Sequence, residues 1–253
     1  MSLKGRNQKF SIARGEDSET SMEEYEITLD EGMVILDCVH RIQHEHEPDM
    51  AVRWNCKAGK CGSCSAEING KPRLMCMTRM SDIVKERPLG EPVEIRPMKA
   101  FPHVKDLVTD VSWNYEVNKK ILPYQHPDTD DPRMLQEDVD RVQEFRKCIE
   151  CFLCQDVCHV LRDSDMKAEY AGPRFLVRNA MLEMHPLDQG NRLETIKNEN
   201  GIGLCNITKC CTEVCPENIT ITDNAIIPLK ERVVDEYYDP LKWIWRKLTG
   251  KTN

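Results

Sequence analysis

The sequence lacks any apolar run that approaches the ~20 residues of a membrane-spanning helix, so we expect no part of it to cross a bilayer. Its beginning, M-S-L-K-G-R-N-Q-K-F, lacks the apolar stretch of a signal or transit segment. P-loop, G-x-G-x-x-G, H-E-x-x-H and nucleophile-elbow motifs are missing, which predicts no substrate-converting site. The formal net charge of −8 disfavours nucleic acid as the main partner.

Cysteine, in contrast, is abundant, with 13 in 253 residues. Clustered cysteines in a chain without a secretory signal favour metal ligation over a disulfide framework. The length suits one large or two ordinary domains. The cysteines fall into three groups, and their spacing carries most of the functional information.

The first group has the spacing C-x4-C-x2-C-x11-C, which is typical of plant-type [2Fe–2S] ferredoxins. Its members are Cys56, Cys61, Cys64 and Cys76. Gly59 and Gly62 allow the tight turns and close backbone approach that a cluster-binding loop needs. Asn69-Gly70 predicts a hairpin that returns the fourth cysteine to the loop. Structural zinc, which prefers two separated C-x2-C pairs, is the alternative.

The residues before this loop predict a small α+β domain. The stretch 25–30, Y-E-I-T-L-D, alternates like a strand. Apolar residues from Ile35 to Ile42 then follow the i, i+3, i+4, i+7 pattern of an amphipathic helix. Cys38 lies on that apolar stripe, and we interpret it as a core residue because free cysteine is often buried.

The second group reads C-I-E-C-F-L-C-Q-D-V-C and the third reads C-N-I-T-K-C-C-T-E-V-C-P. In two-cluster bacterial ferredoxins the last cysteine of each run serves the other cluster. This rule predicts a [4Fe–4S] cluster held by Cys148, Cys151, Cys154 and Cys215. It assigns three ligands to the other cluster, namely Cys158, Cys205 and Cys211.

Thr208 stands where the fourth ligand of that other cluster belongs. A threonine hydroxyl is a poor replacement for a thiolate, and a cubane corner without its ligand readily loses iron, which leaves [3Fe–4S]. Because cluster type and charge set the reduction potential, we expect this centre to be the most oxidising one. Cys210 competes with Cys211 as a ligand, and the spacing favours Cys211.

The rest of the chain predicts a mostly helical second domain. Helical patterns run from Leu135 to Val142 and onward from Pro173, which suits a first helical position. A further helix is predicted from Thr222 to Tyr238, with Pro228 as a possible kink. Near the end, an apolar stripe lies beside basic residues, which fits either a membrane interface or a helix docked on the chain's own core. Its residues are Leu241, Ile244, Trp245 and Leu248.

Together the three cysteine patterns resemble the iron–sulfur subunit of succinate dehydrogenase and fumarate reductase. The resemblance covers nearly the whole chain, including F-P-H-V-K-D-L-V-T-D. It implies an α+β architecture, with a plant-type [2Fe–2S] ferredoxin (β-grasp) domain at 1–105 and an all-α bacterial-type ferredoxin domain at 106–253. It also implies two partners, a flavoprotein subunit that carries FAD and a transmembrane anchor that helps form a quinone site.

The resemblance implies an electron-transfer subunit of a respiratory complex. Electrons would pass from FAD through the [2Fe–2S], [4Fe–4S] and [3Fe–4S] clusters in that order during succinate oxidation. The chain would lie peripherally on the cytoplasmic face of a bacterial plasma membrane. The same subunit in a fumarate reductase would work in reverse, and a thiol-linked fumarate reductase or a flavin 2-hydroxy-acid oxidase would keep the clusters with another catalytic partner.

Two departures from the family concern the quinone pocket. Many members have proline after the cysteine that matches Cys158, where this chain reads C-H-V-L-R-D. Many also have histidine at the position of Asn206. The pocket is therefore not transferable residue by residue, and we predict menaquinone as the quinone. The candidates beside the third group are His159, Asn206, Thr208 and Lys209.

Overall fold

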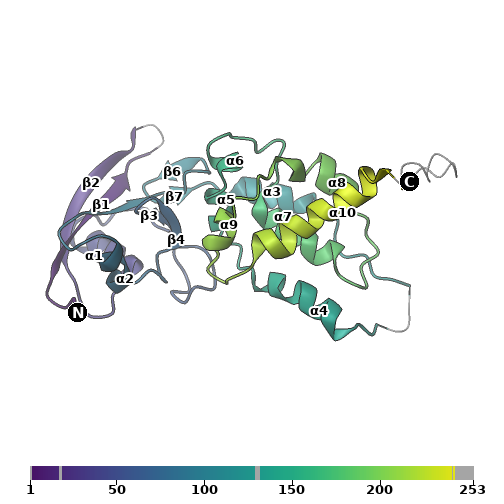
Figure 1. Cartoon of the computed structure of the whole chain (residues 1–253). Helices are drawn as coiled ribbons and strands as arrows, with labels where there is room; N and C mark the ends of the chain where they lie inside the picture. Colours follow the sequence, from purple (N-terminus) through teal and green to yellow (C-terminus); the bar gives the residue numbers. More distant parts are fainter. Residues whose placement is uncertain (1, 17–18, 129–131, 241, 243–253) are drawn as a thin grey trace.

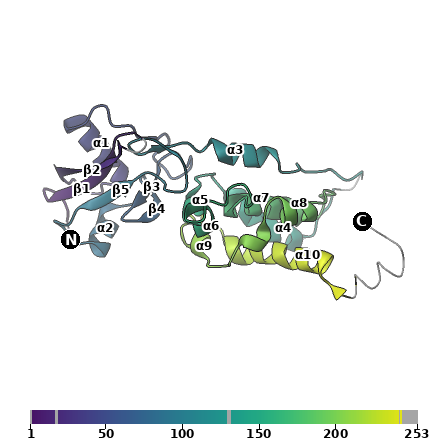
Figure 2. The ribbon, with the colours of Figure 1, turned by 90° about the horizontal axis from the view of Figure 1, so that it is seen from above.

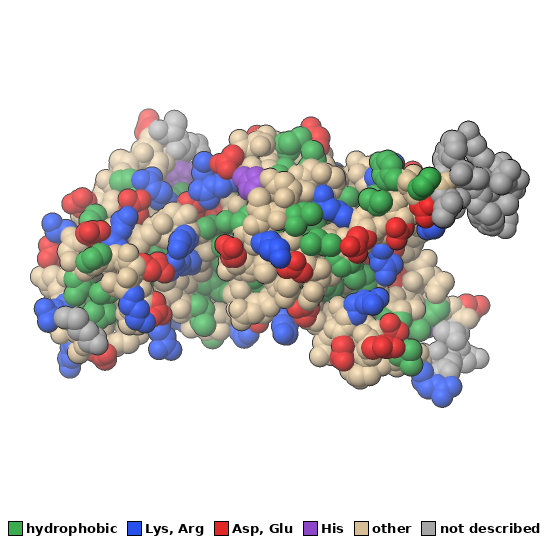
Figure 3. Space-filling view, in the orientation of Figure 1, with side chains coloured by type: hydrophobic (Ala, Val, Ile, Leu, Met, Phe, Trp, Pro, Cys, Tyr) green, Lys and Arg blue, Asp and Glu red, His purple; other side chains and the backbone are tan. Residues whose placement is uncertain are grey.

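The structure is a computed structural model, and it describes residues 2–16, 19–128, 132–240 and 242. A lobe built on a β-sheet is followed by a helical lobe, and the two lie side by side along the long axis of the molecule (Figures 1 and 2). Basic and acidic side chains are intermixed over the visible face of both lobes (Figure 3). The predicted order of an α+β domain and a helical domain is confirmed.

The first lobe contains a five-stranded mixed sheet in the order β2-β1-β5-β3-β4. Strands β1 and β5 are parallel, and the other neighbours are antiparallel. Two helices, α1 and α2, complete the lobe, and Cys38 of α1 is fully buried in its core, as predicted. The bounds are β1 Asn7–Arg14, β2 Ser21–Thr28, α1 Ile35–Glu45, β3 Ser65–Ile68, β4 Lys71–Leu74, α2 Met80–Glu86 and β5 Val93–Arg96.

The predicted hairpin is present between β3 and β4. Asn69 and Gly70 form its turn with φ angles of 51° and 74°, the positive values that a type I′ turn requires. The chain then reaches Cys76, whose N–H donates to the sulfur of Cys64 at 3.4 Å. The hairpin therefore returns the fourth cysteine to the first group.

A second, two-stranded sheet connects the lobes. It consists of β6 (His103–Lys105) and β7 (Val108–Thr109). Between these strands the buried carboxylate of Asp106 accepts the N–H groups of Gly15 and Ala51 at 2.9 and 2.7 Å. The domain boundary placed between residues 105 and 106 falls in the turn of this hairpin and stays a prediction.

The second lobe consists of helices joined by loops of different lengths. Helix α7 begins at the predicted proline, packs on η4 and α8, and runs beside α3 and α10 (Figure 2). The bounds are α3 Ser112–Lys119, α4 Gln136–Gln143, η2 Glu144–Lys147, α5 Leu153–Asp156, α6 His159–Arg162, α7 Pro173–Glu183, α8 Leu193–Asn198, η3 Ile202–Leu204, α9 Cys210–Glu213, η4 Ile221–Ile226 and α10 Ile227–Tyr237.

The helix predicted from Thr222 with a kink at Pro228 differs in the structure. A π-helical turn, η4, precedes α10, and Pro228 lies in the first turn of α10 instead of its interior. In the first turn of a helix the N–H that proline lacks has no partner within that helix, so Pro228 is compatible with the start of α10. The stripe from Leu241 to Leu248 lies outside the described residues.

The two lobes meet through buried polar contacts. Arg162 of α6 forms an ion pair with Glu67 of β3, whose side chain is 5% exposed. Asp156 of α5 accepts the N–H of Ala100 at 2.9 Å. Burial raises the pKa of the Asp156 carboxyl. These contacts fix α5, which carries Cys154, and α6, which follows Cys158, against the sheet lobe.

Candidate cluster-binding sites

The first cysteine group lies on the loop between α1 and β3 and on the chain after β4. Cys56 is exposed, whereas Cys64 and Cys76 are buried. The N–H groups of Ala58 and Lys60 both donate to the sulfur of Cys56 at 3.3 Å. The loop therefore folds around a sulfur atom and directs backbone donors at it, as the ligand loops of iron–sulfur clusters do.

The thiols of this group differ in acidity. Burial disfavours the Cys61 thiolate, but hydrogen bonds from Ser63 and Cys56 outweigh it and lower the pKa of Cys61 to about 6. Burial raises the pKa of Cys64 to about 12. The thiolate is the form that binds metal. Cys61 therefore favours this form at neutral pH, whereas Cys64 needs the positive charge of a nearby metal to ionise.

The second group comes together around one cavity in the helical lobe. Burial raises the pKa of Cys151 to about 12 and that of Cys154 well above its usual value. The structure brings Cys215, from the end of α9, to the three cysteines of the second run, although their ligation of a cluster stays a prediction. The cavity is lined by Cys148, Ile149, Cys151, Phe152, Cys154, Arg174, Val177, Cys215, Pro216, Glu217, Ile219 and Ile221.

The first and second groups are in direct contact. Gly62, with a φ of +67°, approaches so closely that a Cβ atom added there would lie 2.6 Å from the Cα of Cys151. The hydroxyl of Ser65 donates to the carbonyl oxygens of Gly62 and Cys151, each at 2.9 Å. A side chain at position 62 would push the two cysteine groups apart.

The third group joins three separate segments of the helical lobe. Cys158 precedes α6, Cys205 follows η3 and Cys211 belongs to α9. Burial raises the pKa of Cys211 to about 11, and the negative charges of Cys210, Cys205 and Cys158 add to this shift. The structure thus brings the three predicted ligands together, and it leaves the competitor Cys210 beside them.

The loops of all three groups contain residues with positive φ angles. Such angles are uncommon outside glycine, and a β-branched residue such as Ile207 adopts them only under constraint. Left-handed residues that alternate with right-handed ones turn successive N–H groups inward and form anion-binding concavities. The non-glycine residues concerned are Lys57, Glu150, Phe152, Ile207 and Lys209. This backbone fits the sulfide-rich clusters predicted from the sequence.

A single metal ion requires a tighter arrangement of ligands. Within residues 2–16, 19–128, 132–240 and 242, no three His, Cys, Asp or Glu side chains converge closely enough to hold one ion. Four close ligands are what the structural-zinc alternative would need.

Comparisons with known proteins agree with this geometry. Residues 9–116 match the 2Fe-2S iron-sulfur cluster binding domain family, and residues 144–219 match the 4Fe-4S dicluster domain family. A chain in the structure of the Mycobacterium smegmatis Sdh1 complex in the apo form has 57% sequence identity and a TM-score of 0.89, with 93% of this chain and 99% of that chain covered.

Two curated relatives extend the comparison. The succinate dehydrogenase iron-sulfur subunit of Bacillus subtilis is 29% identical over 85% of this chain and 88% of its own length. One subunit of the fumarate reductase (CoM/CoB) of Methanothermobacter marburgensis is 32% identical over 90% of this chain, which spans 44% of that relative. The chain belongs to the family of iron–sulfur subunits of succinate dehydrogenase and fumarate reductase. The resemblance stated from the cysteine spacing is confirmed.

In this iron–sulfur subunit the quinone candidates have different surroundings. The amide of Asn206 donates to Nε2 of His159 at 2.6 Å, so these two lie together beside the third group. Lys209 is directed to Asp223, with 2.7 Å between Nζ and Oδ1. Thr208 is exposed, and its hydroxyl lies 3.3 Å from the sulfur of Cys210. All four stay candidates.

Sequence reasoning missed two residues at the third group. Lys230 of α10 donates to the carbonyl oxygen of Cys205 at 2.6 Å. Tyr170 is buried beside the same cysteines. No motif marks either residue, because Lys230 comes near the group through the packing of α10 and Tyr170 through the segment between α6 and α7.

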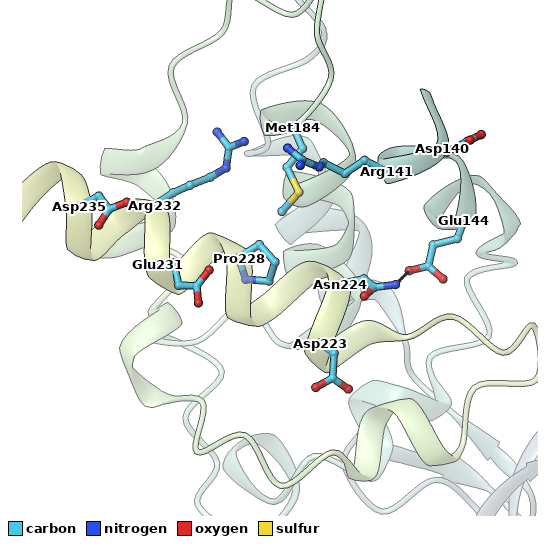
Figure 4. A pocket seen from close by; sticks show the side chains of 10 residues that line it. All are labelled: Asp140, Arg141, Glu144, Met184, Asp223, Asn224, Pro228, Glu231, Arg232 and Asp235. Carbon is cyan, nitrogen blue, oxygen red and sulfur yellow. Dashed lines mark hydrogen bonds between the residues drawn. The ribbon is translucent and has the colours of Figure 1, made fainter. Parts of the chain in front are cut away.

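A groove on the helical lobe is separate from the cysteine groups. It lies between α4 and α10, and residues of both helices, of η4 and of the end of α7 line it (Figure 4). Glu144 accepts a hydrogen bond from Asn224 across it at 2.5 Å. It contains no thiol, and its acidic side chains are intermixed with Arg141 and Arg232.

No helix in the described parts of the chain is both long and apolar enough to cross a membrane.

Proposed function

We propose that this chain is the electron-transfer subunit of a succinate dehydrogenase and relays electrons from the FAD of a flavoprotein subunit to a membrane quinone. One observation carries the proposal. The first cysteine group is in contact with the second, and α5 links the second to the third, in a chain 57% identical to one in the Sdh1 complex of Mycobacterium smegmatis.

In this proposal each cysteine group holds one cluster. The ligands of the [2Fe–2S] cluster are Cys56, Cys61, Cys64 and Cys76. Those of the [4Fe–4S] cluster are Cys148, Cys151, Cys154 and Cys215. Those of the [3Fe–4S] cluster are Cys158, Cys205 and Cys211. When bound, such clusters carry single electrons at reduction potentials that depend on cluster type, charge and hydrogen bonds.

The protein holds the three cysteine groups near one another and limits the access of water between them. The backbone contact between Gly62 and Cys151 joins the first group to the second. Cys154 of the second group and Cys158 of the third are only about one helical turn apart along α5, so this helix links the two groups. Cys154 and Cys158 are both buried, so water has little access to the space between these two groups.

Two exposed apolar areas support a partner at each end of the relay. Beside the first group Trp54 and Met77 are 48% and 57% exposed, and we assign them to the flavoprotein subunit. Beside the third group Leu204 and Ile207 are 37% and 39% exposed. We assign this area to the membrane anchor and menaquinone, with the chain bound peripherally to the cytoplasmic face of the plasma membrane.

A fumarate reductase is the second candidate function. The Methanothermobacter relative, named as a fumarate reductase (CoM/CoB), favours it at 32% identity. The higher identity to the chain of the Sdh1 complex favours succinate oxidation. Turnover of the complex separates succinate oxidation with a quinone from fumarate reduction with a quinol. Identification of the co-purifying subunits separates a thiol-linked fumarate reductase, which would need no membrane anchor and no quinone.

The first test is EPR of the anaerobically purified complex, which is air-oxidised and then reduced with dithionite. The second is an assay of succinate oxidation with different quinone analogues. We expect a three-iron signal in the oxidised sample, a [2Fe–2S] signal after reduction, and faster turnover with menaquinone than with ubiquinone analogues. Two four-iron clusters without a three-iron signal would contradict the ligand assignment and make Cys210 a ligand. A strong preference for ubiquinone would contradict the quinone assignment alone.

A further inference from the structure

Tyr170 has a buried hydroxyl that the fold does not explain. Its side chain is 1% exposed, and no described atom meets the distance and angle of a hydrogen bond with the hydroxyl. Buried polar atoms nearly always have a partner, so an unpaired one requires a reason. Phenylalanine would fill the same space without an unpaired polar group, and the hydroxyl is therefore not needed for packing.

The hydroxyl faces the third cysteine group. Tyr170 belongs to the same buried cluster of side chains as Cys158 and Cys211, and Cys205 packs against that cluster. The ring itself lies in the apolar core of the helical lobe, among residues such as Leu161 and Leu176. A phenol has one O–H donor, and the sulfur atoms beside it are acceptors.

The backbone around Tyr170 is fixed from several directions. Its N–H donates to the carbonyl oxygen of Met166 at 2.9 Å, and the next N–H, of Ala171, donates to Asn200 at 3.2 Å. The buried amide of Gln155 donates to the carbonyl oxygen of Ala171 at 3.0 Å. This anchoring fixes the backbone at Tyr170, and the packing of its ring in the core leaves the phenol little freedom to turn.

We propose that the Tyr170 hydroxyl donates a hydrogen bond to a sulfur atom of the third centre, either the Cys205 thiolate or a cluster sulfide, and thereby raises its reduction potential. The inference rests on the proposed [3Fe–4S] cluster at Cys158, Cys205 and Cys211. A hydrogen bond to sulfur stabilises the more negative, reduced state, because the donor compensates part of the added charge. The hydrogen bond from Tyr170 and the absence of a thiolate at position 208 then both raise the reduction potential of this centre.

The experiment is a redox titration of the purified complex followed by EPR, with Tyr170→Phe and the control Tyr25→Phe. Tyr25 is also largely buried, but its hydroxyl donates to Glu23 at 2.8 Å in the other lobe. We expect Tyr170→Phe to lower the midpoint potential of the three-iron centre alone. A tenfold loss of stabilisation of the reduced state corresponds to about 59 mV for a one-electron couple. Tyr25→Phe should leave all three potentials unchanged.

Proton ENDOR of the oxidised three-iron signal, with samples in H2O and D2O, gives a second measurement. We expect one strongly coupled exchangeable proton in the wild type that Tyr170→Phe lacks. An unchanged potential together with an unchanged proton coupling would overturn the role of Tyr170 and leave the cluster assignment intact. A wild-type complex without any three-iron signal would overturn the cluster assignment, and this inference with it.

Discussion

At the scale of single residues, the third group depends on the side chain at position 208. Thr208 is exposed, and its hydroxyl oxygen lies 3.3 Å from the sulfur of Cys210. We expect Thr208→Cys to supply a fourth thiolate, so that the three-iron EPR signal of the oxidised complex is lost and a second four-iron signal appears on reduction. The lower potential of that centre should slow quinone reduction.

Cys210→Ser provides the matched control for this prediction. If Cys211 is the ligand, as the spacing predicts, Cys210→Ser should keep the wild-type EPR signals and the succinate oxidation rate. A control variant that loses the three-iron signal would show that the chain uses Cys210 instead. The two thiols are neighbours in sequence and in space, so only this pair of variants distinguishes them.

Much of the candidate site was predictable at this scale, because cluster ligands recur at fixed spacings. The spacing alone placed Cys215 with the second group and Cys158 with the third, and the fold brings them together in that way. Tyr170 and Lys230 were not predictable. A lone tyrosine or lysine in a helical lobe has no spacing rule, and its meaning depends on which helix packs beside it.

At the scale of structural elements, the loop of the first group must pass close to Cys151. Gly62→Ala adds a Cβ that would lie 2.6 Å from the Cα of Cys151, at a φ of +67°. Gly70→Ala is the matched control, since its φ is +74° but nothing lies within 4 Å of the added Cβ. We expect a loss of about 1 kcal/mol for Gly70→Ala, from backbone strain alone.

For Gly62→Ala we expect a loss of roughly 2–4 kcal/mol, because backbone atoms must also move apart. The measurement is the unfolding midpoint of the purified complex in urea, followed by the visible absorbance of its clusters. Electron transfer between the first two centres should slow in Gly62→Ala and stay normal in Gly70→Ala. Equal losses of stability in the two variants would mean that the close approach of position 62 to Cys151 does not add to the cost of the substitution.

The elements themselves were predictable where a local rule decided them. Asn69-Gly70 predicted the hairpin, and the apolar pattern from Ile35 to Ile42 predicted α1, since both depend on neighbouring residues only. The π-helical turn Ile221–Ile226 was missed. Its hydrogen bonds reach one residue further than those of an α-helix, and the wider turn depends on packing against α7, which no local pattern records.

At the scale of the whole molecule, one buried ion pair connects the lobes. Glu67 of β3 and Arg162 of α6 have side chains only 5% and 19% exposed. We expect Arg162→Met to destabilise the protein by about 3–5 kcal/mol, because it leaves the Glu67 carboxylate buried without its counter-charge. The double variant Glu67→Gln with Arg162→Met should recover part of this loss, since no charge is then stranded. Urea midpoints of the four proteins would measure the coupling, and purely additive losses would contradict it.

The clusters should also stabilise the two lobes to different extents. The first lobe has a continuous sheet and its own apolar core. Helices α5, α6 and α9 have only four residues each; α5 and α9 carry cysteines of the second and third groups, and Cys158 directly precedes α6. Helices this short are not stable by themselves, so bound clusters must hold them together. We expect hydrogen exchange after iron removal to speed up in α5, α6 and α9 while β1 and β5 stay protected. Equal loss of protection in β1 would mean that the lobes unfold as a single unit, and the electron relay would then depend on the sheet as much as on the helices that bear its cysteines.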